Sequence, residues 1–423
     1  MMQLLDLDIE VLNLIIVYLR PTEQILRNNN LNLAYTCKSL LKLAQPYAAE
    51  AFDDSVPSTR YELLRRTLNE NAEYGKNVKT FSFTVQDPSR EHEISDFVQH
   101  FPNLRELKCE SALKSLRLAA TILSPNLPFR SGLQRLTLYE SRISTKQLFE
   151  LAALPKLKSL DIEDDGPKTS IFEPEDVTLV GNSVLQSLLI GSLHIDVFLK
   201  LLSFTSSLTE LVCPMPTPGP LKPIQSNIPR RRAEPIRIPY VLSPRNFMSP
   251  FRCLSRILTT LHLNSGGIWG NFDGTRMDFS QFVALKKLGI SSLCFFSPLP
   301  LGLSRDGFYK LLPPSLEELD LFFQYDIGIF YSLCRPGDGF GVEKTGRARF
   351  VAGELRELEY RWILELAQYK RERLRFLDSV LILEGTRQVT SLYKSEIWTP
   401  PASVEHVFAE ADVFLEVRVR VDR

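Results

Sequence analysis

One short apolar pattern recurs along most of this chain: an apolar residue, two others, an apolar residue, one other and an apolar residue. Its copies are VKTFSF (78), LRELKC (104), LQRLTL (133), LKSLDI (157), LQSLLI (185), LTELVC (208), LTTLHL (258), LKKLGI (285), LEELDL (316) and LDSVLI (377). The first six copies start 26, 29, 24, 28 and 23 residues apart. A period of about 20–29 residues is typical of stacked repeats with one strand each. The spacing therefore predicts a solenoid whose repeats bury their apolar faces against one another.

The segments between copies have helical periodicity. EISDFVQHFPNL, STKQLFELAALPKL, HIDVFLKLLSFTSSL and DFSQFVALKKL are each expected to form one short amphipathic helix leading into the next strand. Ser or Asp precedes several of them as an N-cap. The earlier segment STRYELLRRTLNENAEYGKNV is expected to be a capping helix, with a capping-box spacing at Thr59 and Glu62 and a C-terminal Gly75.

The N-terminal fifty residues have a different pattern. LDIEVLNLIIVYL (7–19) is helical in period and ends before Pro21, and a second apolar segment, LNLAYTCKSLLKLAQPY, is closed by Pro46. The first run is too short to span a membrane, and its flank is acidic, which does not fit a secretory signal. A helical unit this small is expected to be stabilised by a partner or by the neighbouring domain.

These two segments resemble the F-box, the helical module that binds the adaptor subunit of SCF ubiquitin ligases. The resemblance implies adaptor binding by Leu7, Glu10, Val11, Leu12, Ile15, Leu19, Cys37, Lys38 and Leu40. Asp8 stands where the family has its signature proline. The alternative is a helical cap that covers the end of a larger domain.

Taken as a whole, the chain resembles F-box/leucine-rich-repeat proteins, most closely the divergent ones of filamentous fungi. The resemblance implies an α/β fold: an F-box-like helical module followed by an irregular leucine-rich-repeat solenoid with a curved parallel sheet. The expected divisions are a helical module over 1–52, a linker and capping helix over 53–77, and a solenoid over 78–423 with insertions at 214–250 and 335–352.

The first insertion contains ten prolines, six Lys or Arg and one acid, which favours an extended or disordered loop. It is expected to be dispensable for folding, with a docking or nuclear-localisation patch around Arg230–Arg232 as the alternative. In the second insertion, Glu343 rather than glycine precedes Lys344, so its glycines do not form a Walker phosphate loop. A long helix (GELRELEYRWILELAQYKRERLRFL) and a last strand (SVLILEG) are expected after it.

Composition and motifs argue against catalysis and against binding to nucleic acid or to anionic membranes. The formal net charge is zero, which gives no global reason to bind nucleic acid or an anionic membrane. Six cysteines without a CxxC pair favour a reducing compartment, cytoplasm or nucleus, over a disulfide framework or a zinc site. The five histidines lack metal-ligand spacing, and no GxSxG is present. We therefore expect no enzyme activity, cofactor or metal, and we expect Cys109 and Cys213 to be core residues.

Function is then expected to lie in binding. If the second and third apolar residues of each copy point into the core, the residues beside them line the other, concave face. The expected substrate-binding residues on that face are Arg135, Tyr139, Asp161, Glu163, His262, Asp320 and Phe322. The alternative is that these side chains only keep the face soluble.

Two functions remain open. The first is a substrate receptor of an SCF ligase, with the adaptor, and through it a cullin scaffold, on the N-terminal helices and an unknown protein substrate on the solenoid. The second is a non-catalytic scaffold whose F-box-like segment is only an end cap.

Overall fold

A computed structural model describes residues 51–54, 66, 68–70, 72–85, 97–111, 118–139, 143–163, 183–191, 193–216, 244–264, 275–296, 305–323, 329–330, 357–384 and 393–422. The expected adaptor-binding residues and the second insertion, 335–352, lie outside these ranges. The chain divides into two compact units, considered separately below. Unit 1 comprises Met1–Ser170 with Val177–Leu185, and unit 2 comprises Ile171–Asp176 with Gln186–Arg423.

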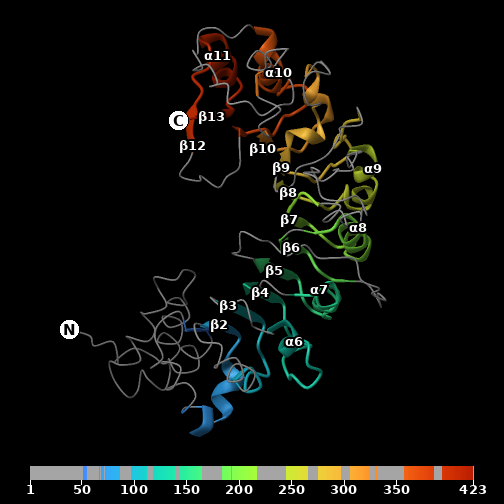
Figure 1. Cartoon of the computed structure of the whole chain (residues 1–423), viewed down its shortest axis with the longest axis vertical. Coiled ribbons are helices and arrows are strands. Elements are labelled where there is room, and N and C mark those ends of the chain that lie inside the picture. Colours follow the sequence, from blue (N-terminus) through green and yellow to red (C-terminus); the bar gives the residue numbers. More distant parts are fainter. Residues whose placement is uncertain are drawn as a thin grey trace, which may run out of the picture. The chain divides into compact units, whose positions relative to one another are not determined.

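Unit 1 contains a parallel sheet in which each strand pairs with the next along the chain. Its strands are β1 (Ala51–Asp54), β2 (Thr80–Val85), β3 (Glu106–Ser111), β4 (Arg135–Tyr139) and β5 (Ser159–Glu163). Its helices are η2 (Ala72–Asn77), α6 (Leu118–Ile122) and α7 (Thr145–Ala152). Figure 1 shows α6 and α7 on the same side of β3–β5.

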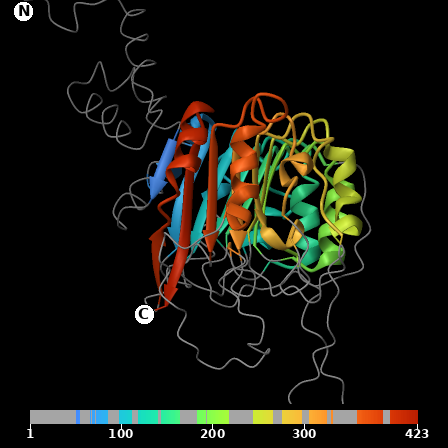
Figure 2. The same ribbon diagram turned by 90° about the horizontal axis from the view of Figure 1, so that it is seen from above.

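Unit 2 contains a mostly parallel sheet with the strand order β6-β7-β8-β9-β10-β11-β13-β12. Its strands are β6 (Ser187–Ile190), β7 (Glu210–Pro214), β8 (Thr260–Asn264), β9 (Lys287–Ser291), β10 (Glu318–Phe323), β11 (Ser379–Glu384), β12 (Tyr393–Ile397) and β13 (Phe414–Asp422). Its helices are α8 (Ile195–Phe204), α9 (Pro244–Met248), η4 (Pro250–Leu254), η5 (Ser292–Cys294), η6 (Phe308–Leu311), α10 (Glu357–Gln368) and α11 (Ala402–Glu410). Strands β12 and β13 are antiparallel, and β13 runs to the C-terminus (Figure 2).

Each of the ten motif copies starts two residues before a strand, from Val78 before β2 to Leu377 before β11. The prediction that the motif marks the strands of a mostly parallel sheet is therefore confirmed within each unit. The hydrogen bonds repeat with the motif: the Thr209 carbonyl accepts from Thr259 and Thr260 N–H at 2.7 and 3.1 Å. The same pair of hydrogen bonds recurs between successive strands. It therefore sets which residues of neighbouring strands lie side by side.

The apolar motif positions form the cores. The first and second apolar positions are buried in every copy, and so is the third wherever its side chain is described. In unit 1 the predicted Ser-capped helix is confirmed as α7. Its N-cap Ser144 accepts from Gln147 N–H, and the Gln147 side chain accepts from Ser144 N–H at 2.9 Å. Cys109 and Cys213 are fully buried core residues, as predicted.

Two helices predicted in unit 2 differ from the structure: one does not form, and one is shorter than expected. DFSQFVALKKL forms turns instead of a helix, because the Asp278 carboxylate accepts from Ser280 N–H and Phe279 N–H bonds to the Leu311 carbonyl. The helix expected to reach residue 377 ends at Gln368 as α10 and continues as turns. The strand expected to be the last, now β11, is followed by β12, α11 and β13.

The expected insertion 214–250 is too wide. Its first residue ends β7, Met215 is buried, Pro244–Met248 form α9, and Pro250 begins η4. Phe247 of α9 is buried and stacks on Phe198 of α8 with ring centroids 5.3 Å apart. Both ends of the segment therefore belong to the core, and replacing all of 214–250 would remove buried apolar side chains. Residues 217–243 lie outside the described part.

The start of unit 1 also departs from expectation. Strand β1 crosses the expected module boundary at residue 52 and pairs in parallel with β2. Gly75, expected at the end of a helix, lies inside η2. A Cβ at Gly75 would lie 2.0 Å from the His100 carbonyl oxygen, so the close approach of two backbones requires glycine there.

Candidate protein-interaction surface

In each unit the strands have one face in the core and one face carrying mostly half-buried or exposed side chains. Side chains alternate along a strand, so the third, fifth and seventh motif positions share the face away from the buried leucines. We call this the open face of each unit. In unit 2, α8 and α9 lie on one side of β6–β8 (Figure 1), and the buried Leu188, Leu211 and Leu261 belong to the covered face.

On the open face of unit 1, the expected binding residues contact the preceding strand. Arg135 of β4 forms an ion pair with Glu106 of β3 at 3.3 Å. The Lys108 ammonium lies over the Tyr139 ring, 5.6 Å from its centroid. Asp161 of β5 is half-buried. Arg135 and Tyr139 thus contribute to pairing between neighbouring repeats. A binding partner would contact side chains that already interact with Glu106 and Lys108.

In unit 2 the third motif positions form a polar row on the open face. We call this the polar row: Ser187, Glu210, Thr260, Lys287 and Glu318. The Ser187 hydroxyl donates to Glu210 at 2.8 Å, and Lys287 Nζ lies 2.7 Å from Glu318. Neighbouring members therefore pair across strands, and the charges of Lys287 and Glu318 compensate each other.

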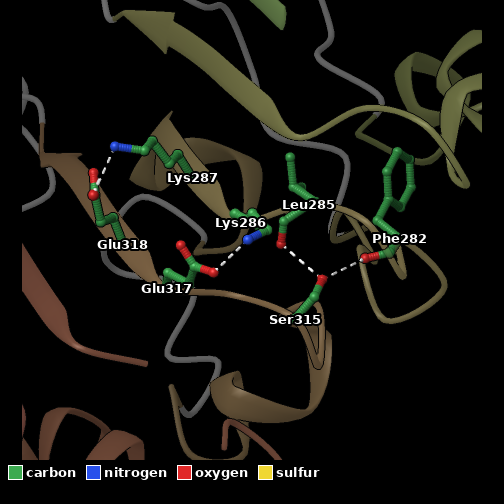
Figure 3. A network of polar contacts seen from close by, with 7 residues as sticks. All are labelled: Phe282, Leu285, Lys286, Lys287, Ser315, Glu317 and Glu318. Atoms are coloured by element: carbon green, nitrogen blue, oxygen red, sulfur yellow. Dashed lines mark hydrogen bonds and ion pairs between the residues drawn. The ribbon is translucent and has the colours of Figure 1, made fainter. Parts of the chain in front are cut away.

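Figure 3 shows how the repeats carrying β9 and β10 are joined beside this row. Lys286 pairs with Glu317 at 2.7 Å, next to the pair of Lys287 with Glu318. The Ser315 hydroxyl donates to the carbonyls of Leu285 and Phe282, at 2.9 and 3.2 Å. Two successive lysines of one repeat thus face two successive glutamates of the next.

The hydrogen bond and charge of Glu318 raise the pKa of Lys287 above its usual value, with smaller contributions from Glu317 and Asp320. Both side chains of the Lys287–Glu318 pair are nearly half exposed, at 45% and 46%. Solvent-exposed ion pairs of this kind contribute at most about 1 kcal/mol. The Lys287–Glu318 pair therefore contributes to the alignment of β9 with β10 more than to the free energy of unfolding.

Beside the polar row runs a second row at the fifth motif position, and it is largely apolar. We call this the apolar row: Leu189, Val212, His262 and Gly289, which are neighbours in the strand register. Leu189, Val212 and His262 are half-buried, and the imidazole of His262 lies across Gly289. An apolar strip bordered by polar side chains is a surface suited to a protein segment.

Sequence reasoning missed Leu189 and Val212. Their signal was a large apolar residue at the variable fifth position of LQSLLI and LTELVC, which LDSVLI shares and where the other copies have Ser, Lys, Thr, Asp, His or Gly. The structure keeps His262 on the surface and brings it next to Val212. Asp320 is half-buried on the same face, on the strand after Gly289.

One expected binding residue is not on the surface. Phe322 is only 2% exposed, and its register partner Ser291 is fully buried, because this end of the β9–β10 face is covered within the fold. Phe322 therefore cannot line a substrate site. The side chain of Glu163 lies outside the described part.

Among the described side chains of the two open faces, no cluster of chemically reactive groups is found. Burial raises the pKa of the Cys213 and Cys294 thiols, which makes them poor nucleophiles. Over the described ranges, no group of three or more His, Cys, Asp or Glu residues could hold a metal ion. Within the same part of the chain, none of the helices is long and apolar enough to cross a membrane.

The fold and these surfaces define an α/β protein of regularly repeated parallel strands. Each unit has an open sheet face. No protein-family model matches the chain, and no curated protein is significantly similar to it in sequence.

Proposed function

We propose that this chain is a substrate receptor of an SCF-type ubiquitin ligase in the cytoplasm or nucleus. The observation that carries the proposal is the in-register stacking of motif copies within each unit, where each copy gives a strand and the strands share an open face. Such a surface, preceded in sequence by a segment resembling an F-box, is the arrangement that a receptor requires. The repeats would form a leucine-rich-repeat solenoid, and the N-terminal helices would bind the adaptor.

The receptor would act by proximity and would make or break no bond itself. Holding a protein substrate near the ubiquitin-charged enzyme converts an intermolecular transfer into an effectively intramolecular one. The apolar row of unit 2 is the best-supported substrate surface, because Leu189 and Val212 are half-buried, adjacent and bordered by polar side chains. Apolar contacts give most of the free energy of such binding, and the polar border sets orientation.

A second candidate function is a scaffold that binds proteins without delivering them to a ligase. The observation that favours it is Asp8, which stands where the F-box family has proline. In this case residues 1–52 would be an end cap, and the open faces would still bind partners.

Co-purification with the SCF adaptor separates the two functions. The full chain and the adaptor are co-expressed, with the chain carrying an affinity tag. The receptor is expected to retain the adaptor, and Val11→Ala with Ile15→Ala is expected to release it. Val184→Ala with Val283→Ala serves as the control, because these two side chains are exposed at 42% and 60%. A chain that never retains the adaptor supports the scaffold.

Substrate binding is tested on the apolar row. In cells, Leu189→Asp should remove a set of co-purifying proteins while the adaptor remains bound. Val283→Asp is the matched control, since it adds the same charge at a side chain that is 60% exposed and belongs to neither row. An unchanged set of bound proteins in Leu189→Asp would place the substrate surface elsewhere.

A further inference from the structure

In unit 1 the residues immediately before the strands form a line of positive charge. Lys79, Arg105, Gln134 and Lys158 directly precede β2, β3, β4 and β5. These strands are parallel and paired in sequence order, so the four residues lie along one edge of the unit 1 sheet. We call them the basic row, because Gln134 is neutral and the other three are cationic.

Backbone hydrogen bonds make the members of the basic row direct neighbours. Arg105 N–H donates to the Lys79 carbonyl at 2.8 Å, and Gln134 N–H donates to the Arg105 carbonyl at 2.7 Å. Lys158 N–H donates to the Gln134 carbonyl at 2.8 Å. Since neighbouring strands lie about 4.8 Å apart, the backbones of Arg105 and Lys158 are about 10 Å apart along the edge.

The corresponding residues of unit 2 are not a basic row. The residues immediately before β6–β11 are Gln186, Thr209, Thr259, Lys286, Glu317 and Asp378. The one cation among them, Lys286, forms an ion pair with Glu317 of the next repeat at 2.7 Å. In unit 1 the neighbours of Arg105 are instead Lys79 and Gln134. The basic row therefore has no acidic member that could neutralise it.

The cations at the two ends of the Arg105–Lys158 stretch are accessible. Arg105 and Lys158 are exposed, and so is Lys156, two positions before Lys158. Within the described part of the chain, none of these three side chains forms an ion pair or a hydrogen bond. Lys79 is half-buried and has contacts of its own. A ligand of the basic row would therefore contact Arg105 and Lys158.

A narrow, acidic ligand fits this edge. The positive charge does not continue onto the strands, because Arg135 is paired with Glu106, and Asp161 is acidic. A nucleic acid needs a broad basic surface to contact its phosphates. An extended peptide is narrower and advances about 3.3 Å per residue, so carboxylates about three residues apart match the separation of Arg105 and Lys158.

We propose that the basic row is the docking site for an acidic, extended segment of a partner protein, with carboxylates on Arg105 and Lys158. This inference rests on the protein-binding role proposed above but not on adaptor binding, so it holds for a receptor and for a scaffold. Exposed charge pairs contribute little affinity each. The basic row therefore orients the partner and speeds its association more than it tightens the complex.

Fluorescence anisotropy of the full chain with a labelled peptide of alternating glutamate and serine tests the proposal at low salt. The expected dissociation constant is about 100 µM or tighter, and a peptide of alternating glutamine and serine should not bind. Arg105→Glu with Lys158→Glu should weaken binding about tenfold or more. Arg66→Glu with Lys146→Glu is the matched control, because it makes the same change in net charge at exposed cations outside the row.

Circular dichroism checks that each variant is folded. Equal weakening by the two double variants would show a response to net charge alone and would overturn the proposal. So would a wild-type chain that does not bind the glutamate peptide, or one that binds a single-stranded oligonucleotide of equal charge more tightly. Each of these results leaves co-purification with the adaptor unchanged, so failure here is distinct from failure of the receptor function.

Discussion

The imidazole of His262 lies across the backbone of Gly289, its register partner on the next strand of unit 2. A Cβ added at Gly289 would lie 2.5 Å from His262 Nδ1 and 2.9 Å from its Cγ. Real Cβ atoms do not approach a ring so closely. Glycine at this position therefore lets the histidine lie flat on the open face and extends the apolar row across β9.

This contact predicts a coupling between the two positions. Gly289→Ala should displace the ring and destabilise the chain by about 1–3 kcal/mol. In a His262→Ala background the same change should cost at least about 1 kcal/mol less. Chemical denaturation of the four variants measures the coupling. Gly191→Ala is the control, because nothing lies within 4 Å of its added Cβ. Equal costs in both backgrounds would mean that the ring does not rest on Gly289.

Adjacent leucines on opposite faces of β6 should respond very differently to the same substitution. Leu188 is fully buried and Leu189 is half-buried on the open face. Leu188→Asp places an unpaired charge in the core and should cost several kcal/mol, about 3 or more. Leu189→Asp should cost about 1 kcal/mol or less. Thermal unfolding compares the two, and similar losses would show that the assignment of faces in β6 is wrong.

The Lys287–Glu318 pair should make stability depend on pH in the alkaline range. The pKa of Lys287 is raised in the folded chain, so the stabilisation is complete below the unfolded lysine pKa of about 10.4. It is lost as the pH rises through the folded pKa. The free energy of unfolding of wild type minus that of Lys287→Met should therefore stay constant up to about pH 9 and fall as the pH rises above about 10.

The size of that change should stay below about 1 kcal/mol, because the pair is exposed. Salt at about 1 M should reduce it further by screening. A difference that rises with pH would contradict the direction given for Lys287.

The end of the expected insertion should prove essential. Phe247 is 5% exposed and stacks on Phe198. Phe247→Ala should therefore cost about 3–5 kcal/mol. Phe376→Ala is the matched control at a side chain that is 59% exposed, and it should be nearly neutral. Urea unfolding measures the stability of both variants. A Phe247→Ala variant as stable as wild type would support the wider insertion, 214–250.

Much of the parallel sheet could be predicted from the sequence, because its strands share one motif at a regular interval. Leu188, Leu211 and Leu261 illustrate this: each is the second apolar residue of its copy, and each is fully buried. Strand β13 was missed because it carries no copy of the motif. Its VFLEVRVRV does alternate apolar and charged residues, which is a signal for a strand of its own.

The candidate surface was harder to predict, because its contacts join residues of different repeats. Gly289 follows His262 by 27 positions, and only the strand register makes them neighbours. Arg135 and Tyr139 seemed free for a partner when their own repeat was read alone. Aligning it with the preceding repeat would have put Glu106 beside Arg135, as the strand register does in the sheet.

Adaptor binding is the central claim, and isothermal titration of the purified full chain with the purified SCF adaptor tests it most directly. The receptor should bind with a dissociation constant of about 1 µM or tighter. Val11→Ala with Ile15→Ala should weaken binding by about 2–5 kcal/mol if both side chains are buried by the adaptor. Its circular dichroism should match that of wild type. A wild-type chain that gives no binding at micromolar concentrations would contradict the receptor function and leave the scaffold.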